Sequence, residues 1–206
     1  PSTDDNRRHG LSQFLVDMSL PGITVRPIIN LTGQHDFNEV FFGDVLLSDD
    51  ALLGEVDLAW KQASAELAYE RSGPERFLST YLVLGELAHI QQNTTDKRTQ
   101  EAVGRLVAQL WTLRQMSLSV ANMLQAGVSP AVEAALVKDI GTNFEKRIPN
   151  VARQFRPVPD SDISDEDRQR FETFTNLATS LAPALTIRGG SQEILRGIIA
   201  RELGLR

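Results

Sequence analysis

The stretch between residues 96 and 126 constrains the fold of this chain most, because its apolar residues recur at alternating spacings of three and four. The stripe consists of Val103, Leu106, Leu110, Leu113, Ser117, Val120 and Leu124. Residues spaced in this way lie on one face of an α-helix, so the stretch predicts a single long amphipathic helix. Such a stripe is typical of core packing in a helical bundle and not of a cofactor site.

Further helices are predicted on both sides of this stretch. The pattern is helical from about residue 57 to residue 90, which indicates a long first helix. After Gly127, Ser129 and Pro130 supply an N-cap and a favoured first position for another helix. Its apolar positions are Val132, Leu136, Ile140 and Phe144. We expect Pro149 to end this helix.

The C-terminal part of the sequence predicts two more helices. Ser164, with Asp167 three residues later, marks the start of a fourth main helix, and Pro183 limits its end. Ser191 opens a short terminal helix. The chain is therefore expected to contain four main helices and a short terminal one.

The first 55 residues predict strands and turns instead. Phe14, Val16 and Met18 alternate with polar neighbours, Pro21-Gly22 is a turn signal, and another apolar cluster covers residues 40–47. A few strands with both edges exposed rarely stand alone, so we expect them to pair with strands outside this chain.

The predicted fold class is α+β but mostly α. Residues 1–55 are interpreted as the second half of a β domain, which is incomplete, and residues 56–206 as an up-and-down helical bundle.

Composition excludes several classes of function. The 206 residues carry a net charge of −6 with interspersed signs, so no basic stripe favours nucleic acid. There is no cysteine, no apolar run of about 20 residues that could span a membrane, and no signal peptide in the charged N-terminus. We expect a cytoplasmic protein. His9, His35 and His89 lack ligand-like spacing, so no metal site is expected.

Glu70 is a candidate reactive group because of a proline four residues later. Pro74 has no N–H, so the carbonyl of Glu70 loses its helical partner, and the helix is expected to bend there. A carboxylate on a disturbed turn beside Arg71 can differ from a surface glutamate in solvation and protonation. The alternative is a solvated glutamate on a kinked helix.

The segment Gly189-Gly190-Ser191 lies before the terminal helix. Free backbone N–H groups at the positive end of a helix suit a cofactor or an anionic ligand. The alternative is a flexible turn in which Ser191 is only an N-cap.

Taken together, these segments resemble the acyl-CoA dehydrogenase family. Residues 15–27 and 37–45, followed by Leu53-Gly54-Glu55 and Trp60, are similar to the second half of its middle β domain. The Glu70-Arg71 helix and the terminal Gly-Gly-Ser-Gln-Glu-Ile helix are similar to the first and last parts of its C-terminal helical domain. The resemblance covers nearly the whole chain.

This resemblance implies an FAD-dependent enzyme that desaturates an acyl-CoA thioester between its α and β carbons. A glutamate removes the α proton, flavin N5 accepts hydride from the β carbon, and an electron-transfer flavoprotein collects the electrons. Many members carry the base just before the terminal helix, where this chain has Gly189. Members that resemble isovaleryl-CoA dehydrogenase carry it before an arginine on the first helix, where this chain has Glu70.

The resemblance also implies roles for other residues. The N–H of Gly189 would polarise the thioester carbonyl, and Arg71 would line the active site. The residues implied to lie against the flavin are Gly190, Ser191 and Glu193. Arg201 would approach the CoA portion. Arg71 and Arg201 could equally be ordinary helix-surface charges.

The sequence departs from the family in several places. The family's N-terminal helical domain and the first half of its β domain are absent, so another part of the polypeptide or another chain must supply them. The Arg-x-x-Phe-Gly segment that grips a neighbour's flavin is not seen between Thr94 and Gln109, and the later Gln-x-x-Gly-Gly loop is unrecognisable. Arg188 replaces an aromatic residue beside the acyl chain, which indicates either a polar or bulky acyl group or an outward turn toward an acidic partner.

Two function classes follow from these features. The first is an acyl-CoA dehydrogenase, as a homo- or hetero-oligomer, with Glu70 as the base. The second is a non-catalytic subunit that stabilises an active homologue in a hetero-oligomer. The glutamate at the base position favours the first class, and the missing flavin-gripping segment favours the second.

Overall fold

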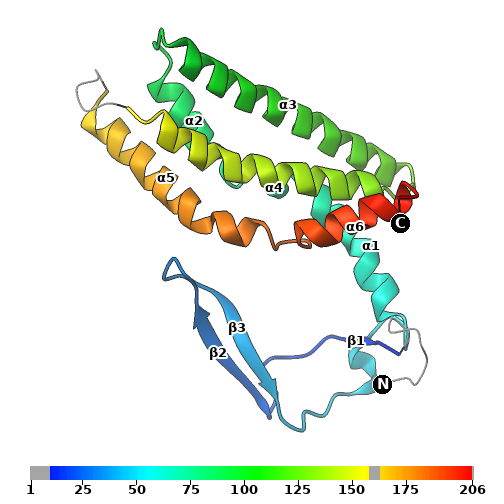
Figure 1. Ribbon diagram of the computed structural model, residues 1–206. Helices are drawn as coiled ribbons and strands as arrows, with labels where there is room; N and C mark the ends of the chain where they lie inside the picture. Colours follow the sequence, from blue (N-terminus) through cyan, green and yellow to red (C-terminus); the bar gives the residue numbers. More distant parts are fainter. Residues whose placement is uncertain (1–9, 158–162, 206) are drawn as a thin grey trace. The chain divides into compact units, whose positions relative to one another are not determined.

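The computed structural model describes residues 10–157 and 163–205. The chain forms two compact units, which divide between Leu67 and Ala68 within the helix α1 (Ala59–Ser72). The predicted fold class is confirmed, because short strands come first and helices make up the rest (Figure 1). The domain boundary predicted at residue 55 stays a prediction.

The first unit contains two small antiparallel pairs of strands. The strand β1 (Gln13–Phe14) pairs with β4 (Leu52–Leu53), and β2 (Ile23–Ile29) pairs with β3 (His35–Phe42). A 3₁₀ turn covers Asp49–Ala51. The described part of the chain holds no other strand, so each pair has two open edges.

Two local predictions in this unit have different outcomes. The turn at Pro21-Gly22 is confirmed, and Gly22 has a positive φ of 91°. The alternation of Phe14, Val16 and Met18 predicted a longer strand, but β1 ends at Phe14 and the other two residues lie outside it. Alternation over so few residues is a weak signal without a partner strand.

The second unit is a helical bundle in which α4 is central. After a 3₁₀ turn at Pro74–Arg76 come α2 (Tyr81–Ile90), α3 (Lys97–Gln125), α4 (Ala131–Gln154), α5 (Asp165–Leu185) and α6 (Gln192–Glu202). The helix α4 contacts α2, α3, α5 and α6. No helix in the described residues is long and apolar enough to cross a membrane.

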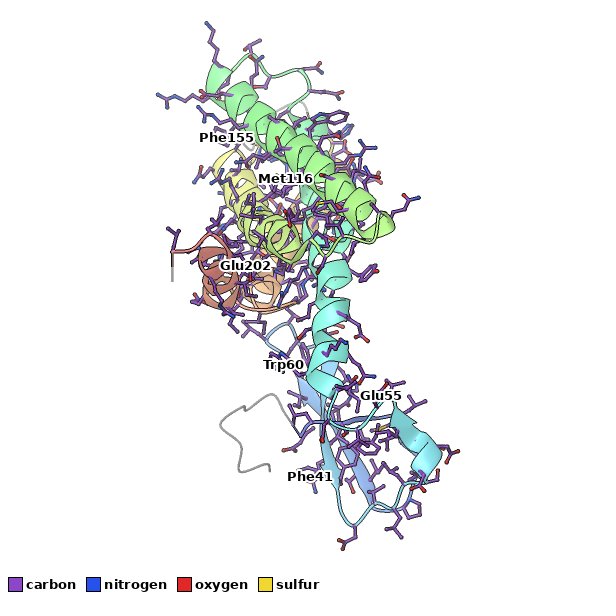
Figure 2. The ribbon with its side chains drawn as sticks, turned by 90° about the vertical axis from the view of Figure 1, so that its right-hand side faces the viewer. Phe41, Glu55, Trp60, Met116, Phe155 and Glu202 are labelled. Carbon is purple, nitrogen blue, oxygen red and sulfur yellow. The ribbon has the colours of Figure 1, made fainter. Side chains whose placement is uncertain are left out.

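One core of buried apolar residues holds this bundle together. Its members are Phe77, Val83, Leu84, Leu87, Leu106, Leu113, Val120, Ala134, Val137, Phe144, Ile148, Ala152, Phe171 and Ala178. Met116 and Phe155, both labelled in Figure 2, are partly buried against it. Burial of this apolar surface supplies the main stabilising free energy of the unit.

The predictions for α3, α5 and α6 are confirmed at their starts. Asp96 caps α3, Ser164 caps α5 by accepting from the N–H of Asp167, and Ser191 caps α6 by accepting from the N–H of Ile194. The stripe on α3 is core packing as predicted, because its apolar members are buried in the core or packed against it. The helix α5 continues for two residues beyond Pro183.

The predicted long helix over residues 57–90 is wrong. The chain leaves α1 at Ser72, makes the 3₁₀ turn at Pro74–Arg76, and starts α2 only at Tyr81. The hydrophobic period continues across the break, but Gly73 adopts an extended conformation before the proline. This conformation is the one that a residue before proline favours.

Three predictions for α4 are also wrong. The N-cap is Pro130 and not Ser129, the helix begins at Ala131, and no side chain caps it. Pro149 lies inside the helix and is buried, and the helix continues to Gln154. Proline frees the carbonyl of Glu145, and the hydroxyl of Thr80 donates to that carbonyl at 3.1 Å, which replaces the lost bond. Ile140 is 43% exposed, and the buried face runs instead through positions that include polar residues.

Candidate functional site

Glu70 lies in the last turn of α1, just before the chain turns away at Pro74. Its carbonyl accepts a hydrogen bond from Nε of Arg76 at 2.8 Å. Its carboxylate pairs with the same guanidinium, with 2.5 Å between Glu70 Oε1 and Arg76 Nη2. The Arg76 side chain is only 8% exposed, whereas the Glu70 side chain is 42% exposed. One side of the carboxylate is therefore fixed by a buried cation, and the other side is open.

Gly189 lies beside this carboxylate although it is far away in the sequence. A Cβ built at Gly189 would be 3.4 Å from Glu70 Oε1, in ordinary van der Waals contact. Nε of the buried Arg71 donates to the Gly189 carbonyl at 2.9 Å. The structure thus places Glu70, Arg71 and Gly189 together.

The backbone at Gly189 and Gly190 requires glycine. Their φ angles are 65° and 109°, in the left-handed region that side chains disfavour. These two residues connect α5 to α6 and leave bare backbone next to the start of α6. Burial lowers the pKa of Arg71 in this region, and the charge of Glu70 opposes that effect.

The N-terminal turn of α6 carries Ser191 and Glu193. The hydrogen bond from the Glu193 backbone N–H and the one from Ser191 lower the pKa of the exposed Glu193 carboxyl. Gln192 donates to Asp139 of α4 at 2.8 Å, which anchors the helix start. Arg201 lies in the last turn, exposed, about 15 Å along the helix axis from Ser191. The structure does not bring Arg201 to Glu70 or Gly189.

Arg188 turns toward an acidic residue of its own unit. Its Nη2 lies 3.3 Å from Oε2 of Glu145, which is fully buried, and 3.0 Å from the hydroxyl of Ser79. The other carboxylate oxygen of Glu145 accepts from the N–H of Ser79 at 2.8 Å. The guanidinium therefore balances a buried carboxylate, an arrangement that protein interiors require.

The sequence reasoning did not identify Lys138 as part of this site. Lys138 is fully buried on α4, and its Cε would be 3.6 Å from a Cβ at Gly189. Its ammonium donates to the hydroxyl of Thr142 and to the carbonyl of Leu185, the latter at 3.0 Å. Burial, with a further contribution from the charge of Arg76, lowers the pKa of Lys138 to about 8, while the Glu145 charge opposes the shift.

A signal for these missed residues does exist in the sequence. Lys138, Thr142, Glu145 and Pro149 recur at spacings of four, three and four, so they share one face of α4. That face is the buried one. A buried lysine and glutamate on it indicate a polar site inside the bundle.

The site gathers charged side chains of both signs. Four basic side chains surround it, and they come from different elements: Arg71, Arg76, Lys138 and Arg188. Carboxylates lie among them: Glu70 and Glu75 pair with Arg76, Glu145 pairs with Arg188, and Asp139 interacts with Lys138. Within the described residues, no group of three or more histidine, aspartate or glutamate side chains is arranged to hold a metal ion.

Comparison with known proteins identifies the class to which this fold belongs. No family model matches the sequence. The chain is 33% identical, over 97% of its length, to acyl-CoA dehydrogenase IpdE1 of Mycobacterium tuberculosis, and it covers 52% of that protein. It is 29% identical to acyl-CoA dehydrogenase FadE34 of the same organism, again over 97% of this chain but 27% of the relative.

Solved structures have the same fold. A steroid acyl-CoA dehydrogenase variant, named Tcur3481-Tcur3483 G363A, superimposes over 99% of this chain and 54% of its own, with a TM-score of 0.81 and 18% identity. The ChsE4-ChsE5 complex of Mycobacterium tuberculosis matches 99% of this chain and 55% of its own, with a TM-score of 0.74 and 23% identity.

The chain is thus a member of the acyl-CoA dehydrogenase family, and it corresponds to the C-terminal half of that fold, as the motifs predicted. It spans about half the length of IpdE1 and about a quarter of the length of FadE34.

Proposed function

We propose that this chain supplies the catalytic base of a flavin-dependent acyl-CoA dehydrogenase. Glu70 takes the α proton of the acyl-CoA thioester, and a double bond forms between the α and β carbons as a hydride leaves the β carbon. The observation that carries the proposal is that Glu70 Oε1 lies 3.4 Å from the point that a Cβ would occupy at Gly189. Base and carbonyl donor, which come from opposite ends of the bundle sequence, can therefore act on one thioester.

The chemistry explains why these groups must be close. An α C–H is a weak acid, so a base needs a fixed position, and the negative charge that develops on the thioester oxygen needs fixed donors. The N–H of Gly189 is the proposed donor. The charge of Arg71, which is proposed to line the reacting centre, lowers the energy of the enolate-like transition state further.

The residues between α5 and α6 fit the flavin that the family implies. Gly189 and Gly190 adopt positive φ angles and present backbone without side chains. We assign Gly190, Ser191 and Glu193 to the surface that holds FAD. The flavin, when bound, accepts the hydride, and an electron-transfer flavoprotein is the proposed acceptor of its electrons. Because the chain corresponds to half of the fold, other segments must complete the cofactor site.

Substrate contacts are proposed for two arginines. We assign Arg71 to the lining of the reacting centre and Arg201, at the far end of α6, to the CoA portion. Of the two expectations for Arg188, a polar acyl group or an outward turn to an acidic partner, neither describes its pairing with the buried Glu145, which supports a structural role for Arg188.

A second candidate function is a non-catalytic subunit in a hetero-oligomer. ChsE4-ChsE5, which shares this fold, is a complex, and this supports assembly of this chain with another subunit. The flavin content of the purified complete protein distinguishes the two functions. A yellow protein that reduces an electron acceptor with acyl-CoA supports the catalytic one, and a colourless protein that binds flavin only with a homologue supports the other.

The assignment of the base has its own test. We expect Glu70→Gln in the complete protein to lower kcat by about a hundredfold or more, because general bases typically contribute 10²–10⁴. Stopped-flow reduction of the flavin by acyl-CoA measures this rate. Glu66→Gln, exposed one turn earlier on α1, is the matched control and should leave the rate unchanged. Full activity of the Glu70 variant would remove Glu70 from the mechanism.

A further inference from the structure

The structure assigns Arg76 as a positioning residue for Glu70, an inference that rests on the proposed function. It begins with Pro74, which has no N–H to give to the carbonyl four residues earlier. That carbonyl belongs to Glu70, and Nε of Arg76 donates to it at 2.8 Å. The guanidinium thus replaces the backbone donor that proline removed.

The same guanidinium also fixes the carboxylate. Nη2 of Arg76 lies 2.5 Å from Glu70 Oε1, so one rigid, planar group holds the backbone and the side chain of the same residue. Oε1 is also the oxygen that lies 3.4 Å from the Cβ position at Gly189. Arg76 therefore sets the position of the oxygen that faces Gly189.

Arg76 itself has little freedom to move. Its side chain is 8% exposed, and its N–H donates to the carbonyl of Gly73 at 3.0 Å. Its carbonyl packs against α4 at Gly141, where an added Cβ would be only 2.5 Å from the carbonyl oxygen. Only glycine permits this approach, so α4 fixes the turn from which Arg76 extends.

The charges around Arg76 direct it toward Glu70. Lys138 interacts with Arg76 as a like charge on the α4 side. Glu75 lies farther away than Glu70, at 3.8 Å from Arg76 Nε, and its side chain is 53% exposed. Attraction by Glu70 and repulsion by Lys138 act together and favour the observed orientation.

This arrangement matters for proton transfer. The reacting atoms must approach to about 3–3.5 Å, and a displacement of 1 Å can cost about a hundredfold in rate. An otherwise half-exposed glutamate would sample several rotamers, and ordering it costs free energy at each turnover. Arg76 orders the carboxylate before substrate arrives.

The kinetic test uses the complete, flavin-loaded enzyme with Arg76→Gln, Arg76→Lys and the control Glu75→Gln. Butyryl-CoA, octanoyl-CoA and palmitoyl-CoA are the probes, and flavin reduction is followed by stopped flow. We expect Arg76→Gln to lower kcat by about tenfold or more with KM changed by less than about twofold, because Arg76 contacts the base and not the substrate. Lysine keeps the charge but cannot hold both acceptors, so Arg76→Lys should fall between wild type and Arg76→Gln.

Two results would overturn the assignment. One is an unchanged kcat in a folded Arg76→Gln or Arg76→Lys enzyme. The other is a raised KM with unchanged kcat, which would mean that Arg76 binds substrate. Glu75→Gln should behave as wild type, and a loss of kcat there equal to that in Arg76→Gln would also contradict a specific role for Arg76.

A crystallographic test separates this inference from the proposed function. Structures of the wild-type and Arg76→Gln proteins show directly whether the Glu70 carboxylate moves away from Gly189, and we expect a shift of about 1 Å or more. If no probe reduces the wild-type flavin, the proposed function fails while this measurement still decides on Arg76. An unmoved carboxylate contradicts the assignment even in an active enzyme.

Discussion

At the scale of single residues, Lys138 shows how burial can oppose stability near neutral pH. Its side chain is fully buried, its two acceptors are a hydroxyl and a carbonyl, and two arginines, Arg76 and Arg188, interact with it as like charges. Its pKa falls from 10.5 to about 8 in the folded protein, so folding disfavours the charged form.

The depressed pKa of Lys138 makes the stability of the protein depend on pH. Between pH 8 and 10.5 the unfolded chain binds more protons at Lys138 than the folded one, so this residue makes stability rise with pH in that window. Lys138→Met removes this group and so does not share the rise. We therefore expect the free energy of unfolding of the variant minus that of wild type to fall by roughly 3 kcal/mol between pH 7.5 and 10.5, at about 1.4 kcal/mol per pKa unit. Urea unfolding across this range measures it, and a constant difference would contradict the depressed pKa.

At the scale of elements, proline shapes two helices by the same mechanism. Pro74 leaves the carbonyl of Glu70 without its helical donor, and the side chain of Arg76 donates to it instead. In the same way, Pro149 leaves the carbonyl of Glu145 free, and the hydroxyl of Thr80 donates to it. The outcomes differ because the chain turns away at Gly73, whereas α4 continues through Pro149 to Gln154. At Pro149 the side-chain donor from outside the helix satisfies the freed carbonyl, which helps α4 to continue through a buried proline.

The role of Thr80 in α4 can be tested with a double-mutant cycle. Thr80→Val leaves the buried Glu145 carbonyl unpaired, and we expect it to cost about 1–3 kcal/mol of stability. In a Pro149→Ala background, the new N–H at residue 149 can restore the helical bond, so the same change should cost less. Denaturant unfolding measures both. Thr112→Val, which removes an exposed hydroxyl bonded to Ala108, is the control, and equal costs in both backgrounds would contradict the mechanism.

The prolines also mark where sequence reasoning succeeded and where it did not. Local signals located α3 and the start of α6, because the apolar spacing of α3 and the Ser191 cap of α6 act within a few residues. The tolerance of Pro149 depends on Thr80, 69 positions earlier in the sequence, which no local pattern contains. Glu70 was identified from Pro74 and Gly189 from the glycines before the terminal helix, but only the family resemblance joined the two into one site. Lys138 was missed because a lysine on a buried face contradicts the usual pattern.

At the scale of the whole molecule, the two units differ in how completely they bury their apolar residues. The core residues of the bundle all lie at or beyond Phe77. In contrast, the β2–β3 hairpin leaves Ile29, Phe37 and Phe42 more than half exposed. We expect a surface of this kind on a short two-stranded sheet to pack against other protein segments. The chain spans about half of IpdE1, and the rest of such a protein would supply these segments.

This contrast predicts that the bundle folds without the strands. We expect a fragment of residues 58–206, which keeps α1 whole, to unfold cooperatively with a midpoint within about 5 °C of residues 1–206, because both contain the same core. The fragment should also bind less of the dye ANS, since it lacks the exposed hairpin residues. Circular dichroism at 222 nm gives the midpoint and fluorescence the dye binding. Non-cooperative melting of the fragment would mean that the strands are needed to complete the bundle. In that case the exposed residues of the hairpin, Ile29, Phe37 and Phe42, would have to contribute to the stability of this chain itself.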